Sequence, residues 1–144
     1  MKRLGSTRKL AAFSNIRLQL SEQTRVLEAR AEATAGVASE LGDYCRRRAD
    51  LEHEYSRALD KLARTATARH ESHRHRRERE HWPLTGAYAC WQAALEGTRS
   101  LARDHAALGD LYGGALAERL QRAAEDALRL HRKCRDVLAE RHEE

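Results

Sequence analysis

Apolar residues recur at alternating spacings of three and four along the first half of the chain, from about Ile16 to Ala66. Steps of seven from Leu20 meet mostly apolar side chains, and a companion series from Ile16 does the same. This spacing is typical of a long helix with a coiled-coil-like seam. Such a helix cannot bury its stripe against itself, so it needs a second helix from its own chain, a second copy of the chain, or both.

The pattern divides the chain into two predicted helical rods, over about 14–66 and 83–144. Between them, residues 67–82 form a polar run rich in arginine and histidine, which we interpret as a linker. Residues 1–13 form a basic lead-in to the first helix, and Gly113-Gly114 predicts a kink in the second. The residues expected to pack in a dimer or core seam are Leu20, Leu27, Leu41, Leu51, Tyr55, Leu62 and Trp91.

Composition favours an all-α fold. The chain is 41% hydrophobic but only 5% aromatic, with a single proline in 144 residues, and it is dominated by helix-forming types. It contains no apolar run near the roughly 20 residues that cross a bilayer. The cysteines Cys45, Cys90 and Cys134 lie far apart, which argues against a disulfide framework or a zinc site and favours a reducing compartment.

Positive charge is concentrated in one part of the chain. Residues 46–79 hold eleven Arg or Lys against six Asp or Glu, a balance of +5, whereas the remainder holds sixteen of each. A basic patch on an otherwise balanced protein predicts an anionic partner and an affinity that falls with salt. The residues expected to contact that anionic partner are Arg46, Arg47, Arg57, Lys61, Arg64 and Arg69.

Other chemistries are less well supported by the residues. The histidines of the linker, with Glu71, Glu78 and Glu80, fit no familiar metal-site spacing and are surrounded by arginines that repel a cation. A nucleic-acid interface would need aromatic platforms for bases, and the linker has only Trp82. No phosphate-binding glycine loop or nucleophile motif is present, so we expect neither an enzyme, a metal, a cofactor, a nucleic-acid partner nor a small-molecule substrate.

Several segments carry a family resemblance. Residues 46–63 resemble the signature of the FCH region that opens F-BAR domains. Residues 19–23, 90–91, 103–105 and 108–112 are similar, more specifically, to the Slit-Robo Rho GTPase-activating protein group and its close Rho GTPase-activating relatives. The resemblance covers nearly the whole chain.

This resemblance implies long antiparallel helices of an F-BAR-type bundle that dimerise and bind anionic phospholipids through a basic face. It makes the six basic residues named above the predicted lipid-binding residues. It implies a cytoplasmic protein, peripheral at the inner face of the plasma membrane, that links membrane shape to Rho GTPase and actin signalling. An F-BAR domain needs about twice this length, so we expect residues 14–144 to be its N-terminal portion, incomplete at the C-terminus. The alternatives are a coiled-coil adaptor that does not bind lipid, and a truncated regulator that pairs with a full-length relative.

Overall fold

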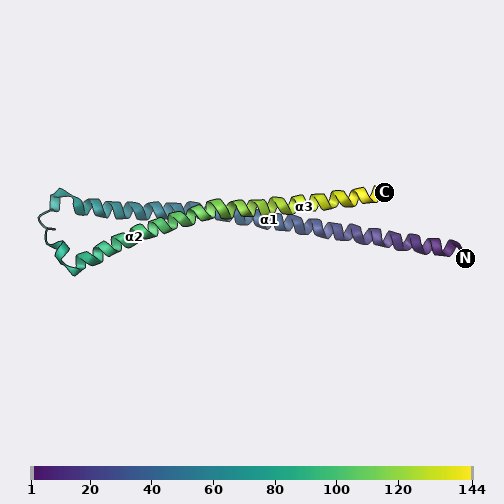
Figure 1. The fold of residues 1–144 in the computed structure, drawn as a ribbon, viewed down its shortest axis with the longest axis horizontal. Coiled ribbons are helices and arrows are strands. Elements are labelled where there is room, and N and C mark those ends of the chain that lie inside the picture. Colours follow the sequence, from purple (N-terminus) through teal and green to yellow (C-terminus); the bar gives the residue numbers. More distant parts are fainter. Residues whose placement is uncertain (1, 144) are drawn as a thin grey trace. The chain divides into compact units, whose positions relative to one another are not determined.

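The computed structural model describes residues 2–143, and within them the chain forms helices and turns with no strand. This confirms the predicted all-α fold. The chain has three long helices, which follow one another in sequence (Figure 1). They are α1 (Lys2–Glu71), α2 (Gly86–Leu111) and α3 (Ala117–Glu143).

The chain divides into two units, and each is described by itself. The hairpin unit comprises residues 42–118, with the second half of α1 and all of α2. The terminal unit comprises residues 1–41 and 119–144, with the first half of α1 and most of α3.

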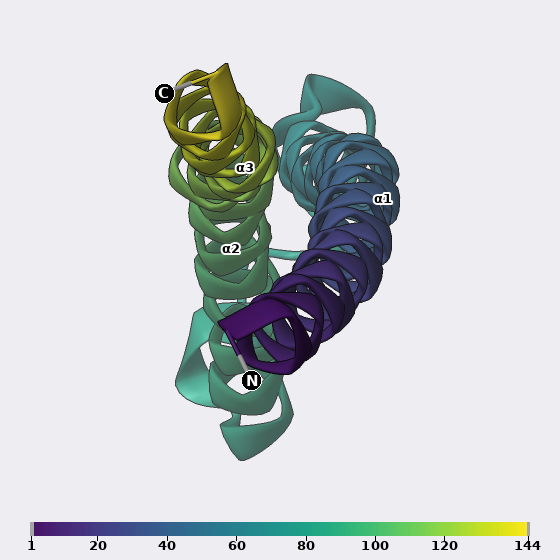
Figure 2. The ribbon, with the colours of Figure 1, turned by 90° about the vertical axis from the view of Figure 1, so that its right-hand side faces the viewer.

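The two helices of the hairpin unit run antiparallel. Ser56 Oγ donates a buried hydrogen bond of 2.6 Å to the carbonyl of Ala102. Farther along α1, Arg99 donates to Thr67 Oγ1 at 2.5 Å, and His70 Nε2 lies 3.2 Å from Tyr88 Oη. The partner number on α2 falls as the number on α1 rises, which fixes the direction of pairing. In Figure 2, α2 lies alongside the second half of α1.

Mostly small residues line the contact between these helices, which we call the inner seam. On α1 its buried positions follow alternating spacings of three and four: Gly42, Cys45, Ala49, Glu52, Ser56 and Ala63. On the opposite helix the buried positions are Leu95, Ala102, Gly109 and, at the start of α3, Ala117. Small side chains allow helix axes to approach closely. The hairpin is therefore stabilised by close packing and buries few large apolar side chains.

Two glycines make that close approach possible. A Cβ atom added at Gly109 would lie 2.9 Å from the imidazole ring of His53, and one added at Gly113 would lie 3.1 Å from the Ala49 Cβ. Both distances are shorter than ordinary van der Waals contact. Glycine fits at these two positions because atoms of α1 occupy the space that a larger side chain would need.

The Gly113-Gly114 pair lies in a π-helical turn, η3 (Tyr112–Leu116). A π turn inserts one residue into a helix. Its effect is visible in the inner seam, where Leu95, Ala102 and Gly109 are seven apart but Ala117 follows after eight. The predicted kink at the two glycines falls within this turn, which shifts the register by one residue and keeps Ala117 buried.

The connection between α1 and α2 is shorter than the predicted linker. α1 continues to Glu71, and the extended backbone of Ser72 ends it. Pro83 lies in a single 3₁₀ turn, and α2 begins after Thr85, whose hydroxyl accepts a hydrogen bond from the Tyr88 amide. At the other end of the chain, α1 already begins at Lys2, so the predicted basic lead-in is part of this helix.

The terminal unit repeats the use of small buried residues. Ala35 and Ala38 are its buried apolar side chains on α1, and Glu28 Oε1 lies 4.0 Å from His131 Nε2 on α3. Large apolar residues near the chain start, such as Leu10 and Phe13, are exposed. Across residues 2–143, no helix combines the length and the apolar character that crossing a membrane requires.

Candidate functional site

The predicted seam residues do not form the core of a single chain. All seven of them, Leu20, Leu27, Leu41, Leu51, Tyr55, Leu62 and Trp91, are exposed. The contrast is sharpest at one pair of neighbours, since Leu62 is 61% exposed and Ala63 is 0% exposed. The predicted stripe lies one residue before the inner seam, which is a rotation of about 100° around the helix. Its role as a dimer contact remains a prediction.

Bulky apolar residues from both helices gather on one side of the hairpin unit, which we call the apolar side. Its exposed members are Tyr44, Leu51, Tyr55 and Leu62 on α1, with Trp91 and Leu101 on α2. Two ring contacts and one shared cavity connect α1 with α2 and the start of the following π turn along this side. The Tyr55 ring meets the His105 ring edge-on at 4.8 Å, the Arg48 guanidinium lies 5.4 Å from the Tyr112 ring centre, and Leu62 and Trp91 line one cavity.

Charged residues occupy the opposite side of the same unit, which we call the charged side. Here His53 Nε2 of α1 lies 3.3 Å from Asp110 Oδ1 of α2. On α1 the helical spacing places Arg46, Arg57 and Arg64 on this side, while Arg47 and Lys61 point away from the inner seam. Arg69 is the exception among the predicted lipid-binding residues, because it lines the cavity that Leu62 and Trp91 share on the apolar side.

Acidic neighbours weaken this basic surface. Arg46 pairs with Asp43 at 2.5 Å, and Arg64 pairs with Asp60 at 2.7 Å. Exposed pairs of this kind contribute little to stability, but each one places a negative charge beside a predicted lipid contact. Among the described residues, Arg47, Arg57 and Lys61 form no ion pair. The structure thus brings five of the six predicted cations to neighbouring faces of α1 and leaves three of them free.

A polar cluster interrupts the inner seam at Glu52, whose side chain is only 7% exposed. Its carboxylate accepts a hydrogen bond from Arg48 Nε at 2.8 Å, and its other oxygen pairs with His105 Nδ1 across the hairpin. The hydrogen bond with His105, and then that with Arg48, lowers the pKa of the Glu52 carboxyl below its usual range. A buried carboxylate with two fixed partners favours one register of the two helices.

This cluster predicts that stability falls in acid. The pKa of Glu52 is lower in the folded chain than in the unfolded chain, so the ionised carboxylate stabilises the fold at pH values above the unfolded pKa of about 4.3. That contribution is lost as pH falls from there through the lowered folded pKa. We expect Glu52→Gln to flatten the acid limb of a plot of melting temperature against pH. An acid limb with the same slope in the variant and the wild type would contradict this assignment.

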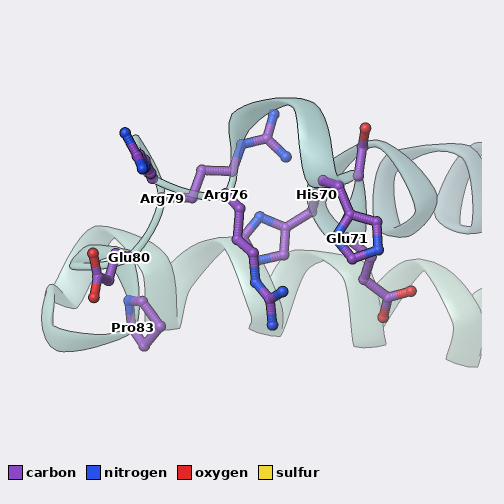
Figure 3. Close-up of a pocket in the computed structure, with 9 residues that line it drawn as sticks. His70, Glu71, Arg76, Arg79, Glu80 and Pro83 are labelled. Atoms are coloured by element: carbon purple, nitrogen blue, oxygen red, sulfur yellow. The ribbon is translucent and has the colours of Figure 1, made fainter.

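The turn between α1 and α2 is the most basic part of the hairpin unit. Residues 69–81 hold five arginines, four histidines and three glutamates. Arg76, Arg77 and Arg79 line an open cavity there together with His70 and His73 (Figure 3). Among the described residues, no group of three His, Cys, Asp or Glu side chains is placed to hold a metal ion; the side chain of His75 lies outside the described part.

Sequence reasoning missed the inner seam and the Glu52–His105 contact. Alanine and glycine give a weak apolar signal, and the leucines one residue away dominate the pattern. The clue was a second 3–4 series of small residues, out of phase with the leucines by one position.

Comparison with known proteins places the chain in a family. Residues 23–107, more than half of its length, match the Fes/CIP4 and EFC/F-BAR homology domain (FCH). The chain belongs to the F-BAR family. This confirms the resemblance inferred from residues 46–63, and the F-BAR domain itself is not catalytic.

The similar proteins are Rho GTPase-activating proteins. Human SLIT-ROBO Rho GTPase-activating protein 3 is 35% identical over 134 residues, which is 93% of this chain and 12% of that protein. Human Rho GTPase-activating protein 4 is 41% identical over 126 residues, covering 85% of this chain and 13% of that protein. SLIT-ROBO Rho GTPase-activating protein 2 of Danio rerio is 32% identical over 122 residues, or 85% of this chain and 11% of that protein. This F-BAR chain therefore spans about an eighth of the relatives it matches, and no solved structure matches it.

Proposed function

We propose that this F-BAR chain is a dimerising module that binds anionic phospholipid surfaces. One observation carries the proposal: the hairpin unit exposes bulky apolar residues on one side and charged residues on the other, although its inner seam is already packed. Contiguous exposed apolar surface of this kind usually marks an interaction site.

A second copy of the chain is the occupant we propose for the apolar side. The exposed leucines Leu51 and Leu62 follow the 3–4 spacing that pairs helices over long distances, and Leu101 continues the surface on α2. Trp91 adds a large ring of the type that anchors protein interfaces. F-BAR family membership supports the same assignment.

We propose that the charged side and the adjoining outer face of α1, which carries Arg47 and Lys61, face lipid. Arg47, Arg57 and Lys61 are free of ion pairs within the described structure, and each cation near an acidic leaflet is worth about 1 kcal/mol. A dimer would present two such surfaces at once, which raises the total affinity without a lipid anchor. The acids of this side limit the attraction, so we expect reversible and salt-sensitive attachment.

The pathway is proposed from the similar proteins, whose names describe them as Rho GTPase-activating. We propose that this chain connects membrane shape to Rho GTPase and actin signalling, at the inner face of the plasma membrane. Its apolar side would also fit the equivalent side of a related F-BAR chain, so pairing with a longer relative is a second form of the same proposal.

A structural adaptor that does not bind lipid is the competing function. The specific observation in its favour is the mixed charge of the charged side, where Asp43, Asp50, Glu54 and Asp60 alternate with the cations. In that case the side is only a solvated helix face.

Sedimentation with phosphatidylserine vesicles separates the two functions. Arg57→Ala with Lys61→Ala should reduce the vesicle affinity roughly 10- to 30-fold, from the loss of about 1 kcal/mol per cation. Asp43→Asn with Asp60→Asn should increase it, because both substitutions remove a negative charge beside a predicted lipid contact. If both double variants pelleted like the wild type, the charged side would not be the lipid-binding surface.

A further inference from the structure

Ser72 is the residue at which the backbone leaves the helical conformation of α1. Its backbone is extended, with φ of −61° and ψ of 129°, and its hydroxyl makes no capping hydrogen bond. The residue is exposed and lines the open cavity at the turn between α1 and α2 (Figure 3). Within the described part of the chain, this hydroxyl is therefore accessible and is not used by the fold.

An arginine, Arg69, precedes Ser72 by three residues. Protein kinases select substrates partly by charges at fixed distances from the acceptor hydroxyl, and many of them require an arginine at this distance. Arg69 is exposed and lies in the last turn of α1, where helices fray. The same spacing occurs at two other hydroxyls of the sequence, Ser6 and Thr67. The structure around each hydroxyl distinguishes the three positions.

Of these three hydroxyls, that of Ser72 alone lies outside a helix. Thr67 is half-buried within α1, where its hydroxyl donates to the Ala63 carbonyl at 2.9 Å and accepts from Arg99 at 2.5 Å. Ser6 is exposed, but its backbone is part of α1. A kinase would have to unfold the helix locally to reach either of them. Ser72 needs no such step.

The cavity beside Ser72 holds cations that the fold does not use. Arg76 and Arg77 line it, and neither forms an ion pair among the described residues. A phosphoserine carries a charge of about −1.5 to −2 and three acceptor oxygens. A guanidinium group binds such oxygens through two parallel hydrogen bonds. Residues 69–81 hold five arginines and three glutamates, so one phosphate would cancel the positive excess of this turn.

Negative charge near Ser72 opposes the phosphate. The carboxyl end of α1 carries about half a negative charge, and Glu71 and Glu80 line the same cavity. Arg79 offsets part of this charge, because its guanidinium donates a 2.5 Å hydrogen bond to the Arg69 carbonyl at the end of α1. The three arginines of the cavity lining therefore still leave a positive balance for a phosphate.

We propose that Ser72 is a phosphorylation site for a protein kinase that selects arginine three residues before the acceptor, and that Arg76 and Arg77 bind the phosphate within the same chain. In this reaction Ser72 Oγ attacks the γ-phosphorus of ATP and the bond from that phosphorus to ADP breaks. The hydroxyl proton passes to the catalytic aspartate of the kinase. The proposal does not rest on lipid binding.

Incubation of the 144-residue chain with ATP and the catalytic subunit of cAMP-dependent protein kinase tests the site, with the phosphate located by mass spectrometry. We expect phosphate on Ser72 in the wild type and in Ser6→Ala. Arg69→Ala should reduce labelling of Ser72 about tenfold or more, because one charge-assisted contact with the kinase is lost. The matched control Arg64→Ala removes the same charge from an exposed position of α1 and should leave this labelling unchanged. Phosphate mainly on Ser6 or Thr67, or equal labelling of Ser72 in the two arginine variants, would overturn the proposal.

Phosphorus NMR of the phosphorylated chain tests whether the arginines bind the phosphate. The second pKa of a phosphoserine is about 6, and nearby arginines favour its dianion, so its pKa should be lower by about half a unit or more in the folded chain than in urea. Arg76→Ala with Arg77→Ala should remove most of that difference. Arg119→Ala with Arg141→Ala, at exposed positions of α3, should leave it unchanged. The same pKa in the wild type and in the Arg76 and Arg77 variant would overturn the assignment of these arginines.

Discussion

Replacing Ala63 with leucine is expected to lower the free energy of unfolding by about 1–3 kcal/mol, because it forces three extra carbons into a fully packed helix contact. Ala63 is the most buried residue of the inner seam, at 0% exposure, so no room remains there for a larger side chain. Urea denaturation followed by circular dichroism measures the effect, which should be the same at every protein concentration.

The adjacent position supplies the control for that experiment. Leu62→Ala removes a large side chain that is exposed in the single chain, so it should leave the packing of the hairpin unchanged. Any loss of stability from this variant should appear only at concentrations where the chain associates, because a dimer is stabilised by mass action. A larger and concentration-independent loss from Leu62→Ala than from Ala63→Leu would mean that the inner seam has been assigned to the wrong stripe.

Replacing Leu51 and Leu62 together with glutamate is expected to convert the proposed dimer to a monomer. Burial of each leucine in an interface is worth about 1.5–3 kcal/mol, so losing both weakens association by at least about 100-fold, and the buried carboxylates would weaken it further. Sedimentation equilibrium measures the change in mass. Circular dichroism should show the same helix content, since both side chains are exposed in the single chain.

A charge change on the other side of α1 provides the matched control. Lys61→Glu lies one residue from Leu62 but points away from the inner seam, and it should leave the mass unchanged. If the Leu51 and Leu62 variant kept the mass of the wild type, the apolar side would not be the dimer interface.

The sequence was sufficient to predict the helices and the stripe of large residues from Leu20 to Leu62. It did not show which stripe packs inside the hairpin. A hydrophobic pattern always favours leucine over alanine and glycine, but small residues are buried where two helices approach closely. The inner seam depends on close approach, which is visible only where Gly109 meets His53 and Gly113 meets Ala49. The burial of the Glu52 carboxylate was also not predictable from the pattern, because its partner His105 lies 53 residues away in the sequence.

The boundaries of the helices show the same limit. α1 extends to Glu71 in a segment without apolar periodicity, where His70 is held by Trp82 and Tyr88 from the far side of the turn. The sequence around His70 does not indicate these contacts, because their partners lie beyond the turn. The exposure of the predicted lipid-binding residues was easier to predict, because arginine and lysine at helical spacing are exposed whatever the partner helix. The ion pairs of Arg46 with Asp43 and of Arg64 with Asp60 were visible only in the structure.

The most direct test of the central claim is the sedimentation of the wild-type chain with vesicles at low and high salt. We predict that the chain pellets with phosphatidylserine vesicles at low salt, remains in solution with pure phosphatidylcholine vesicles, and is released as salt rises because the attraction is screened. Equal pelleting with both lipids, or no lipid-dependent pelleting at low salt, would contradict the account of this chain as an F-BAR module that binds anionic membranes.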